Sequence, residues 1–126
     1  MDHKAEYDPM TNIVILSLIG KPKTTEDIDF LIERTRQAYQ KIGTKVWSIS
    51  DITGMAASNP KLIADFGRKN TVLSEQYVIK ECVFTNKSLQ KLMVQIYNNA
   101  TKSNVPVFKS KEEALSWIEE QKKAAK

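Results

Sequence analysis

The chain has 126 residues, of which 41% are hydrophobic and 27% are charged. This composition indicates one ordinary globular domain spanning residues 1–126 and excludes a disordered or fibrous chain. The net charge is +4, but removing the tail lysines Lys122, Lys123 and Lys126 from the 19 basic residues leaves 16 against 15 acidic residues. Because nucleic-acid binders gather their cations on one face, we expect no nucleic-acid partner.

The first predicted elements are two paired strands. A polar strand at residues 4–7 and an apolar strand at Ile13–Ile19 flank the turn-forming residues 8–12, which is typical of an antiparallel hairpin. The apolar strand is far too short to cross a bilayer, and the first residues lack the basic-then-apolar order of a secretory signal. We therefore expect a cytoplasmic protein without membrane insertion.

A helix and a third strand are predicted next. Thr24 and Asp27 have the spacing of a helix-capping pair, apolar residues recur every three or four positions from residue 28 to 42, and Gly43 suits the left-handed position after a helix. Residues 46–51 then form a β-type segment that ends in polar side chains.

A second helix and a fourth strand follow. Asn59 and Pro60 are typical of a helix start, and the apolar face behind them contains Leu62, Ile63, Phe66 and Leu73. Gly67 in the middle of this helix costs about 1 kcal/mol relative to alanine. Residues 78–84 are predicted to form a strand.

The last third of the chain predicts two more helices around an edge strand. Asn86 is a candidate cap for a helix, whose predicted apolar face is Leu89, Leu92, Met93, Ile96, Tyr97 and Ala100. Pro106 places the short strand at residues 105–108 at a sheet edge, because proline cannot donate to a sheet ladder. Ser110 and Glu113 have capping-box spacing, and the helix after them should turn Ala114, Leu115 and Ile118 inward.

This order of elements predicts an α/β fold. Strands joined through helices are forced parallel, whereas the opening hairpin is antiparallel. We expect a single-domain mixed sheet of about five strands with about four helices packed on it.

Polar residues gather where the predicted parallel strands end. Ligands of open α/β sheets bind at this edge, so the candidate binding residues are Asp51, Thr53, Ser58, Asn59 and Asn86. Each also has a structural interpretation: Asp51 can stabilise its own turn, and Ser58 can either make a helix-entry hydrogen bond or carry a phosphate that the helix dipole favours.

Other chemical groups are sparse. Trp47, Phe66 and Phe84 are either core residues or the wall of an apolar pocket. His3, the one histidine, lies near a terminus that we expect to be mobile, and the one cysteine, Cys82, lies in an apolar strand, where its thiol is not activated and no disulfide partner exists. We expect no enzyme activity, no metal site and no cofactor.

Two stretches carry a family resemblance. Residues 46–54 read Val-Trp-Ser-Ile-Ser-Asp-Ile-Thr-Gly, and residues 107–118 combine a strand, an acidic capped turn and an Ala-Leu-Ser-Trp helix. The second stretch in particular resembles the end of STAS-like, SpoIIAA-like bacterial proteins, whose fold is a mixed sheet with helices. Asp51 matches the aspartate that ends a strand in that family. The family's phosphorylated serine directly follows an aspartate and has a glycine two positions later; Ser58 follows Ala57 and precedes Asn59-Pro60, so this motif is absent.

The resemblance implies two functions. The first is a regulatory or protein-interaction module that contacts a partner through the loop from Asp51 to Asn59 and the neighbouring helix. The partner is another protein or a second copy in a homodimer. The alternative is a carrier for a small apolar or lipid-like ligand, because related domains are grouped with lipid carriers. In that case Trp47, Phe66 and Phe84 would line the pocket.

Overall fold

The computed structural model describes residues 1–125. Lys126, the last of the three tail lysines and the end of the predicted domain, lies outside the described residues. The elements are β1 (Asp2–Asp8), β2 (Ile13–Ile19), α1 (Thr25–Ile42), β3 (Val46–Asp51), α2 (Pro60–Tyr77), β4 (Val78–Phe84), α3 (Ser88–Thr101), β5 (Val107–Phe108) and α4 (Lys111–Ala124).

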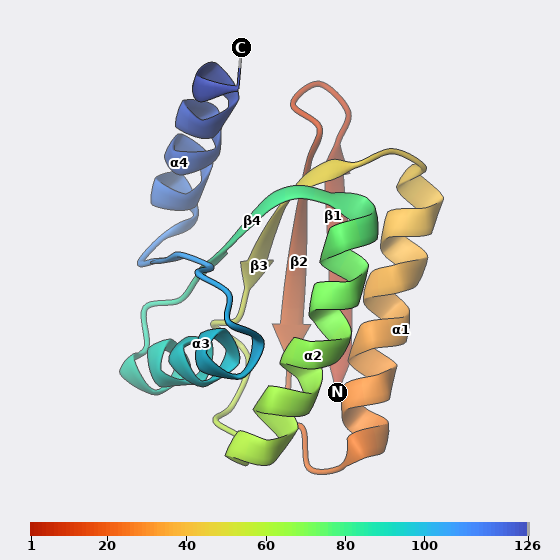
Figure 1. Cartoon of the computed structure of the whole chain (residues 1–126), viewed down its shortest axis with the longest axis vertical. Helices are drawn as coiled ribbons and strands as arrows, with labels where there is room; N and C mark the ends of the chain where they lie inside the picture. Colours follow the sequence, from red (N-terminus) through yellow and green to blue (C-terminus); the bar gives the residue numbers. More distant parts are fainter. Residues whose placement is uncertain (126) are drawn as a thin grey trace.

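The five strands form one mixed sheet in the order β1-β2-β3-β4-β5. The first pair is antiparallel and the other three pairs are parallel, so the predicted α/β architecture is confirmed. The parallel strands end at the lower edge of the molecule in Figure 1, where α1 and α2 begin. β5 has two residues and lies at an edge, as Pro106 predicted.

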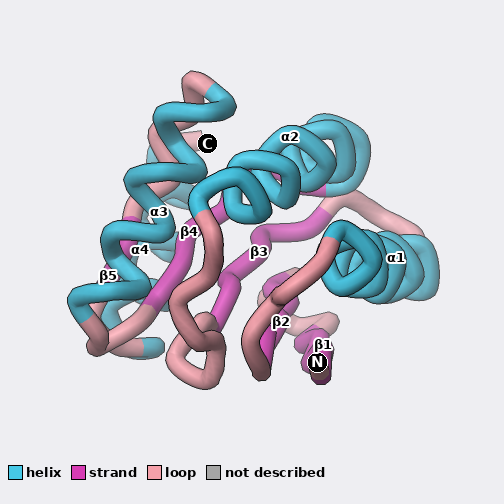
Figure 2. The backbone as a smooth tube through the Cα atoms, turned by 90° about the horizontal axis from the view of Figure 1, so that it is seen from below, coloured by secondary structure: helices cyan, strands magenta, loops and turns pink. Residues whose placement is uncertain are grey.

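Strand alternation divides the core into two layers. On β3, Trp47 and Ile49 belong to a cluster with Ala114 and Ile118 of α4. The intervening Ser48 points to the opposite face, where its hydroxyl meets Tyr39 of α1 at 3.0 Å. Helices α1 and α2 lie together over this second face (Figure 2). The layers are called the α4 layer and the α1–α3 layer below.

The predicted caps of three helices are confirmed. Thr24 Oγ1 accepts from Asp27 N–H at 3.2 Å, Asn59 Oδ1 accepts from Lys61 N–H at 2.8 Å, and Ser110 Oγ accepts from Glu113 N–H at 3.2 Å. Gly43 has φ 80°, the left-handed conformation that a glycine adopts without strain.

The cap predicted for α3 is wrong. Lys87 is its N-cap and makes no side-chain capping bond, and Asn86 lies exposed in the preceding turn. The turn is held by Thr85, whose Oγ1 accepts from Lys87 N–H at 3.2 Å. The buried Thr85 hydroxyl therefore stabilises the turn before α3, and the Asn86 amide does not cap the helix.

The predicted inward face of α3 is also partly wrong. Its buried residues are Gln90, Met93 and Val94, whereas Leu89 and Leu92 are 61% and 52% exposed. The cause is the position of the helix, which packs chiefly against α2 and makes no extensive backbone contact with the sheet. The buried side of α3 is therefore rotated toward α2.

His3 does not lie in a mobile terminus. It is 3% exposed in β1, and its Nε2 lies 2.9 Å from Thr35 Oγ1. Because that hydroxyl donates its own proton to the Leu31 carbonyl, the histidine nitrogen is the donor of this bond. Burial, and secondarily Arg34, lowers the pKa of His3, so the neutral imidazole anchors β1 to α1.

Candidate functional site

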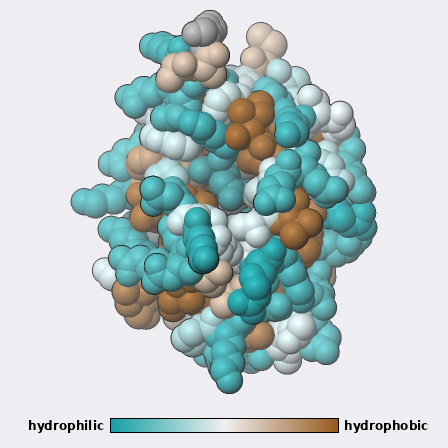
Figure 3. Space-filling model, in the orientation of Figure 1, coloured by the Kyte–Doolittle hydropathy of each residue, from teal (hydrophilic) through white to brown (hydrophobic). Residues whose placement is uncertain are grey.

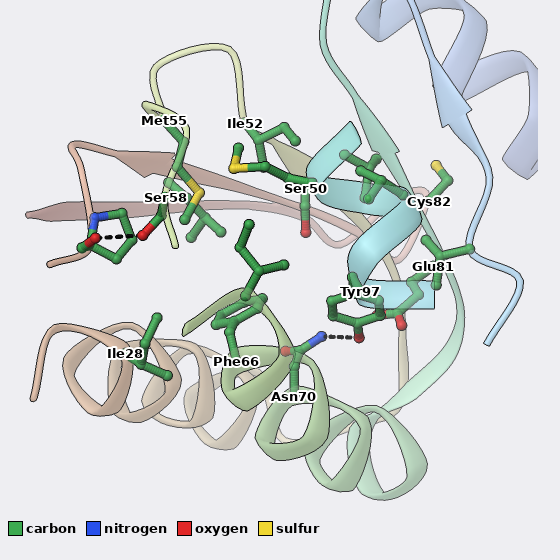
Figure 4. Close-up of a pocket in the computed structure, with 17 residues that line it drawn as sticks. Ile28, Ser50, Ile52, Met55, Ser58, Phe66, Asn70, Glu81, Cys82 and Tyr97 are labelled. Atoms are coloured by element: carbon green, nitrogen blue, oxygen red, sulfur yellow. Dashed lines mark hydrogen bonds between the residues drawn. The ribbon is translucent and has the colours of Figure 1, made fainter. Parts of the chain in front are cut away.

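A cavity of about 80 Å³ lies in the α1–α3 layer between the sheet and helices α2 and α3. Its walls come from β3, β4, the loop after β3, and the facing sides of the two helices. Apolar side chains make most of the surface, among them Ile52, Met55, Ile63, Phe66, Met93 and Val94. Figure 4 shows Ile52, Met55 and Phe66 around an open centre.

The sequence explains why the sheet and α3 leave this space. Ser50 lies on β3 at the cavity wall, and its side chain is much smaller than the valines and isoleucines common in buried strands. Helix α3, which covers this part of β4, is held mainly by α2 rather than by the sheet. The small side chain of Ser50 and the packing of α3 against α2 together leave the cavity unfilled.

One corner of the cavity is polar. Asn70 Nδ2 donates to Tyr97 OH at 2.9 Å, and Ser74 Oγ donates to Glu81 Oε2 at 2.9 Å. Ser50 points into the open space (Figure 4), and its hydroxyl makes no hydrogen bond to any other described residue. The corner therefore consists of Ser50, Asn70, Glu81 and Tyr97 within an otherwise apolar wall.

Burial shifts the ionisation of this corner. Desolvation raises the pKa of Glu81, and the Ser74 hydrogen bond only partly opposes it. Desolvation, with the nearby Glu81 charge, also raises the pKa of Tyr97, which stays a neutral phenol. Burial raises the pKa of the Cys82 thiol to about 12, as expected for an unactivated cysteine.

Glu81 has no cationic partner within residues 1–125. Its neighbour Lys80 points to the other face of the sheet and donates to Gln121 Oε1 of α4 at 2.6 Å. The ion pairs of the described chain are made by other carboxylates. Glu81 is thus a partly buried carboxylate with a single side-chain donor.

A second hollow lies on the outer side of Glu81. This groove, of about 450 Å³, runs between the end of α2, β4, the loop before β5, and Trp117 of α4. Glu81 and Val105 line both the groove and the cavity. The carboxylate therefore lies where the apolar cavity meets the more open groove.

Removing the Glu81 charge should stabilise the protein. Because the folded state raises the pKa of Glu81 above its unfolded value, the charged form opposes folding, and this penalty grows as the pH rises above about 4.5 and levels off above the folded-state pKa. We expect Glu81→Gln to raise the free energy of unfolding at pH 7 by on the order of 1 kcal/mol. Urea denaturation measures this difference in the free energy of unfolding, which should disappear near pH 4.

Glu75→Gln is the matched control, since Glu75 lies on the groove but is exposed. We expect it to leave the free energy of unfolding nearly unchanged at all pH values. A Glu81→Gln variant that is less stable at pH 7, or whose effect is the same from pH 4 to 8, would show that this carboxylate is not destabilised by burial.

The candidate residues at the strand ends make local structural bonds. Asp51 Oδ1 accepts from Thr53 N–H at 2.9 Å and from the Thr53 hydroxyl at 2.6 Å. Ser58 Oγ donates to the Pro22 carbonyl at 2.6 Å, and Asn59 caps α2. These contacts match the structural interpretation of each residue.

Two bonds join the start of α3 to the loop after β3. Lys87 Nζ donates to the Thr53 carbonyl at 2.8 Å, and Gln90 Nε2 donates to the Met55 carbonyl at 2.6 Å. The turn that contains Asn86 is thereby tied to the loop that follows Asp51. Of the five candidates, Ser58 alone also lines the cavity.

The predicted aromatic pocket is divided between the two layers. Phe66 lines the cavity, but Trp47 and Phe84 pack against α4 on the other face of the sheet. The three residues cannot line one pocket, because the sheet lies between Phe66 and the other two. For Trp47 and Phe84 the core interpretation is correct.

One residue of the sequence signals the polar corner. Glu81 is a charged residue inside the apolar segment from Val78 to Phe84, and on strand alternation it shares a face with Val83. Such a residue rarely faces a core unless it has a partner. Asn70 and Tyr97 gave no comparable signal, because polar residues are ordinary on helix surfaces.

Two other features are absent from the described part of the chain, a metal-binding cluster and a membrane-spanning helix. No group of three or more His, Cys, Asp or Glu side chains within it could hold a metal ion. None of its helices is long and apolar enough to span a membrane.

Comparison with known proteins gives the fold. No protein-family model and no curated protein matches the sequence. The structure is similar to that of an uncharacterized protein of the DUF3478 family from Shewanella loihica PV-4, described as having a SpoIIAA-like fold, with a TM-score of 0.62 and 20% identity over 92% of this chain and 91% of that one. The fold of this chain is SpoIIAA-like.

A second solved structure agrees. SLC26A9 matches 87% of this chain with a TM-score of 0.57 and 12% identity, but this chain spans only 20% of that protein. The predicted resemblance is therefore confirmed for the SpoIIAA-like fold. At these identities the similarity extends to the fold alone.

Proposed function

We propose that this chain is a non-catalytic, cytoplasmic binding module of the STAS type that takes a small, mainly apolar ligand into the cavity between the sheet and helices α2 and α3. The observation that carries the proposal is the cavity itself, which is apolar except for one polar corner. Ligand sites of this kind combine an apolar wall with a few polar groups that fix orientation. The free, buried Cys82 accords with a reducing compartment.

The size of the cavity limits the ligand. Its volume of about 80 Å³ is roughly half that of an engineered apolar cavity that binds benzene. The enclosed part of the ligand is therefore a short alkyl or branched group of about three to five carbons. A longer ligand would extend past Glu81 and Val105 into the groove.

Filling the cavity should abolish this binding. We expect the wild-type chain to bind 1-pentanol saturably with one site, and Ser50→Leu to weaken that binding at least tenfold, because the added side chain occupies the ligand's space. Isothermal titration calorimetry measures both. Urea denaturation should show Ser50→Leu to be at least as stable as the wild type, since it adds apolar contacts in an unfilled space.

Ser17→Leu is the matched control. Ser17 lies on β2 between Leu16 and Leu18, both of which face the α1–α3 layer, so its side chain points to the opposite face. This variant should bind 1-pentanol like the wild type. Binding that survives in Ser50→Leu, or is lost equally in Ser17→Leu, would place the alcohol outside the cavity.

A regulatory or protein-interaction role is the second candidate. Its specific support is the exposed pair Leu89 and Leu92 on α3, which lies beside the turn of Asn86; hydrophobic side chains gather at this position of the surface in Figure 3. Exposed apolar patches often mark contact sites. A partner protein or a second copy would use this surface together with the loop from Asp51 to Asn59.

The two candidates predict different results for one variant. Leu89→Gln combined with Leu92→Gln should leave 1-pentanol binding unchanged, because both side chains point away from the cavity lining. If the chain self-associates through this surface, sedimentation should show the double variant to be monomeric where the wild type is dimeric. A wild type that is monomeric at high concentration argues against the homodimer.

A further inference from the structure

We infer that the ligand carries a primary ammonium group and that Glu81 binds it at the junction of the cavity and the groove. This inference rests on the proposed function, because it specifies the polar end of the molecule whose alkyl part fills the cavity. The fold does not suggest it; the position of one carboxylate does.

Glu81 lies where its carboxylate can contact a ligand that occupies the cavity and extends toward the groove. Its side chain lines the apolar cavity on one side and the more open groove on the other. Oε2 accepts from Ser74 at 2.9 Å, whereas Oε1 makes no hydrogen bond within residues 1–125. One carboxylate oxygen is therefore free to accept from a ligand.

Electrostatics favours a cation over other polar groups. A carboxylate taken out of water is costly unless it is paired with a positive charge, and no lysine or arginine of the described chain pairs with Glu81. An ammonium group would supply the missing charge and up to three donors. A ligand carboxylate at the same position would be repelled.

The neighbouring groups suit a donor. Asn70 uses its amide nitrogen on Tyr97, so its carbonyl oxygen remains an acceptor, and the Ser50 hydroxyl is also without a partner among the described residues. Asn70 and Ser50 line the same cavity as Glu81, so its wall carries acceptor oxygens besides Glu81 Oε1 (Figure 4). An ammonium group at the end of a short alkyl chain matches both the acceptors and the apolar wall.

The test compares three ligands of equal length: pentylammonium, 1-pentanol and pentanoate. Calorimetric titrations at pH 7 and constant ionic strength are made with the wild type, Glu81→Gln and the groove control Glu75→Gln. We expect the wild type and Glu75→Gln to bind pentylammonium at least tenfold more tightly than 1-pentanol, and pentanoate most weakly. Glu81→Gln should reduce pentylammonium to the level of 1-pentanol and leave 1-pentanol unchanged.

The outcomes separate this inference from the proposed function. If 1-pentanol binds and pentylammonium gains nothing over it, or if Glu81→Gln does not reduce the gain, the ammonium assignment is overturned while cavity binding stands. Tightest binding of pentanoate overturns it as well. If none of the three ligands binds, the proposed function fails and the inference falls with it.

Discussion

An Ile49→Ala variant is expected to lose about 3–4 kcal/mol in its free energy of unfolding, the range for large-to-small changes in a filled core. Ile49 is fully buried in the α4 layer, packed with Ile13, Cys82 and Ile118. Truncation leaves a void that β3, hydrogen-bonded on both sides, cannot close. Chemical denaturation should detect the loss, and the thermal midpoint should fall by more than about 10 °C.

The next residue along β3 is the control for this prediction. Ser50 faces the cavity, so Ser50→Ala enlarges a space that is already unfilled and should change the free energy of unfolding by less than about 0.5 kcal/mol. Ile49→Val should cost about 1 kcal/mol. Equal losses for Ile49→Ala and Ser50→Ala would contradict the view that one layer is tightly packed and the other hollow.

A Gly67→Leu variant is expected to lose about 2–3 kcal/mol by overpacking. A Cβ atom at Gly67 would lie 2.9 Å from Thr101 Cγ2 and 3.3 Å from Tyr97 Cδ2, so side chains of α3 pack directly against the backbone of α2 at this residue. The larger leucine would push α3 away from α2. Urea denaturation should measure the loss.

Two variants separate crowding from helix propensity. Gly67→Ala gains about 1 kcal/mol of intrinsic helix propensity but meets Thr101, so its net effect should be close to zero. Arg68→Leu, at the adjacent exposed position, should be neutral. If Gly67→Leu is as stable as the wild type, the contact between α2 and α3 is looser than the structure implies.

Local patterns predicted most of the fold. The capping residues Thr24, Asn59 and Ser110 mark helix starts because they bond to neighbouring backbone groups, and no tertiary contact is needed to position them. The parallel order of β2 to β5 follows from the helical crossovers between them. Both inferences depend only on residues close together in the chain.

Helix α3 could not be predicted in the same way. Its apolar residues occupy more of the helix circumference than one buried face requires, so Leu89 and Leu92 were equally good candidates for the core. Which side is buried depends on whether the helix packs on the sheet or on α2. That choice depends partly on Gly67, which lets α3 pack close to α2. From the sequence alone, this glycine predicts only a loss of helix propensity.

The cavity lies deeper in the molecule than most of the binding residues that were predicted at the strand ends. Residues such as Asp51 and Asn59 do lie where strands end, but they hold turns and caps, and their use in binding stays a prediction. The cavity depends on the distance between α3 and β4, which no local pattern encodes. Of its polar corner, Glu81 alone departed from the local pattern of its strand.

The most direct test of ligand binding in the cavity uses the four methionines of the chain. Met55 and Met93 line the cavity and are 7% and 6% exposed, whereas Met10 is 92% exposed and Met1 is 39% exposed. With ¹³C-labelled methionine methyl groups, a 1-pentanol titration followed by NMR should shift the Met55 and Met93 signals saturably and leave those of Met1 and Met10 in place. Shifts of Met10 as large as those of Met93, or no shift of Met55 and Met93 at saturating alcohol, would contradict binding in this cavity.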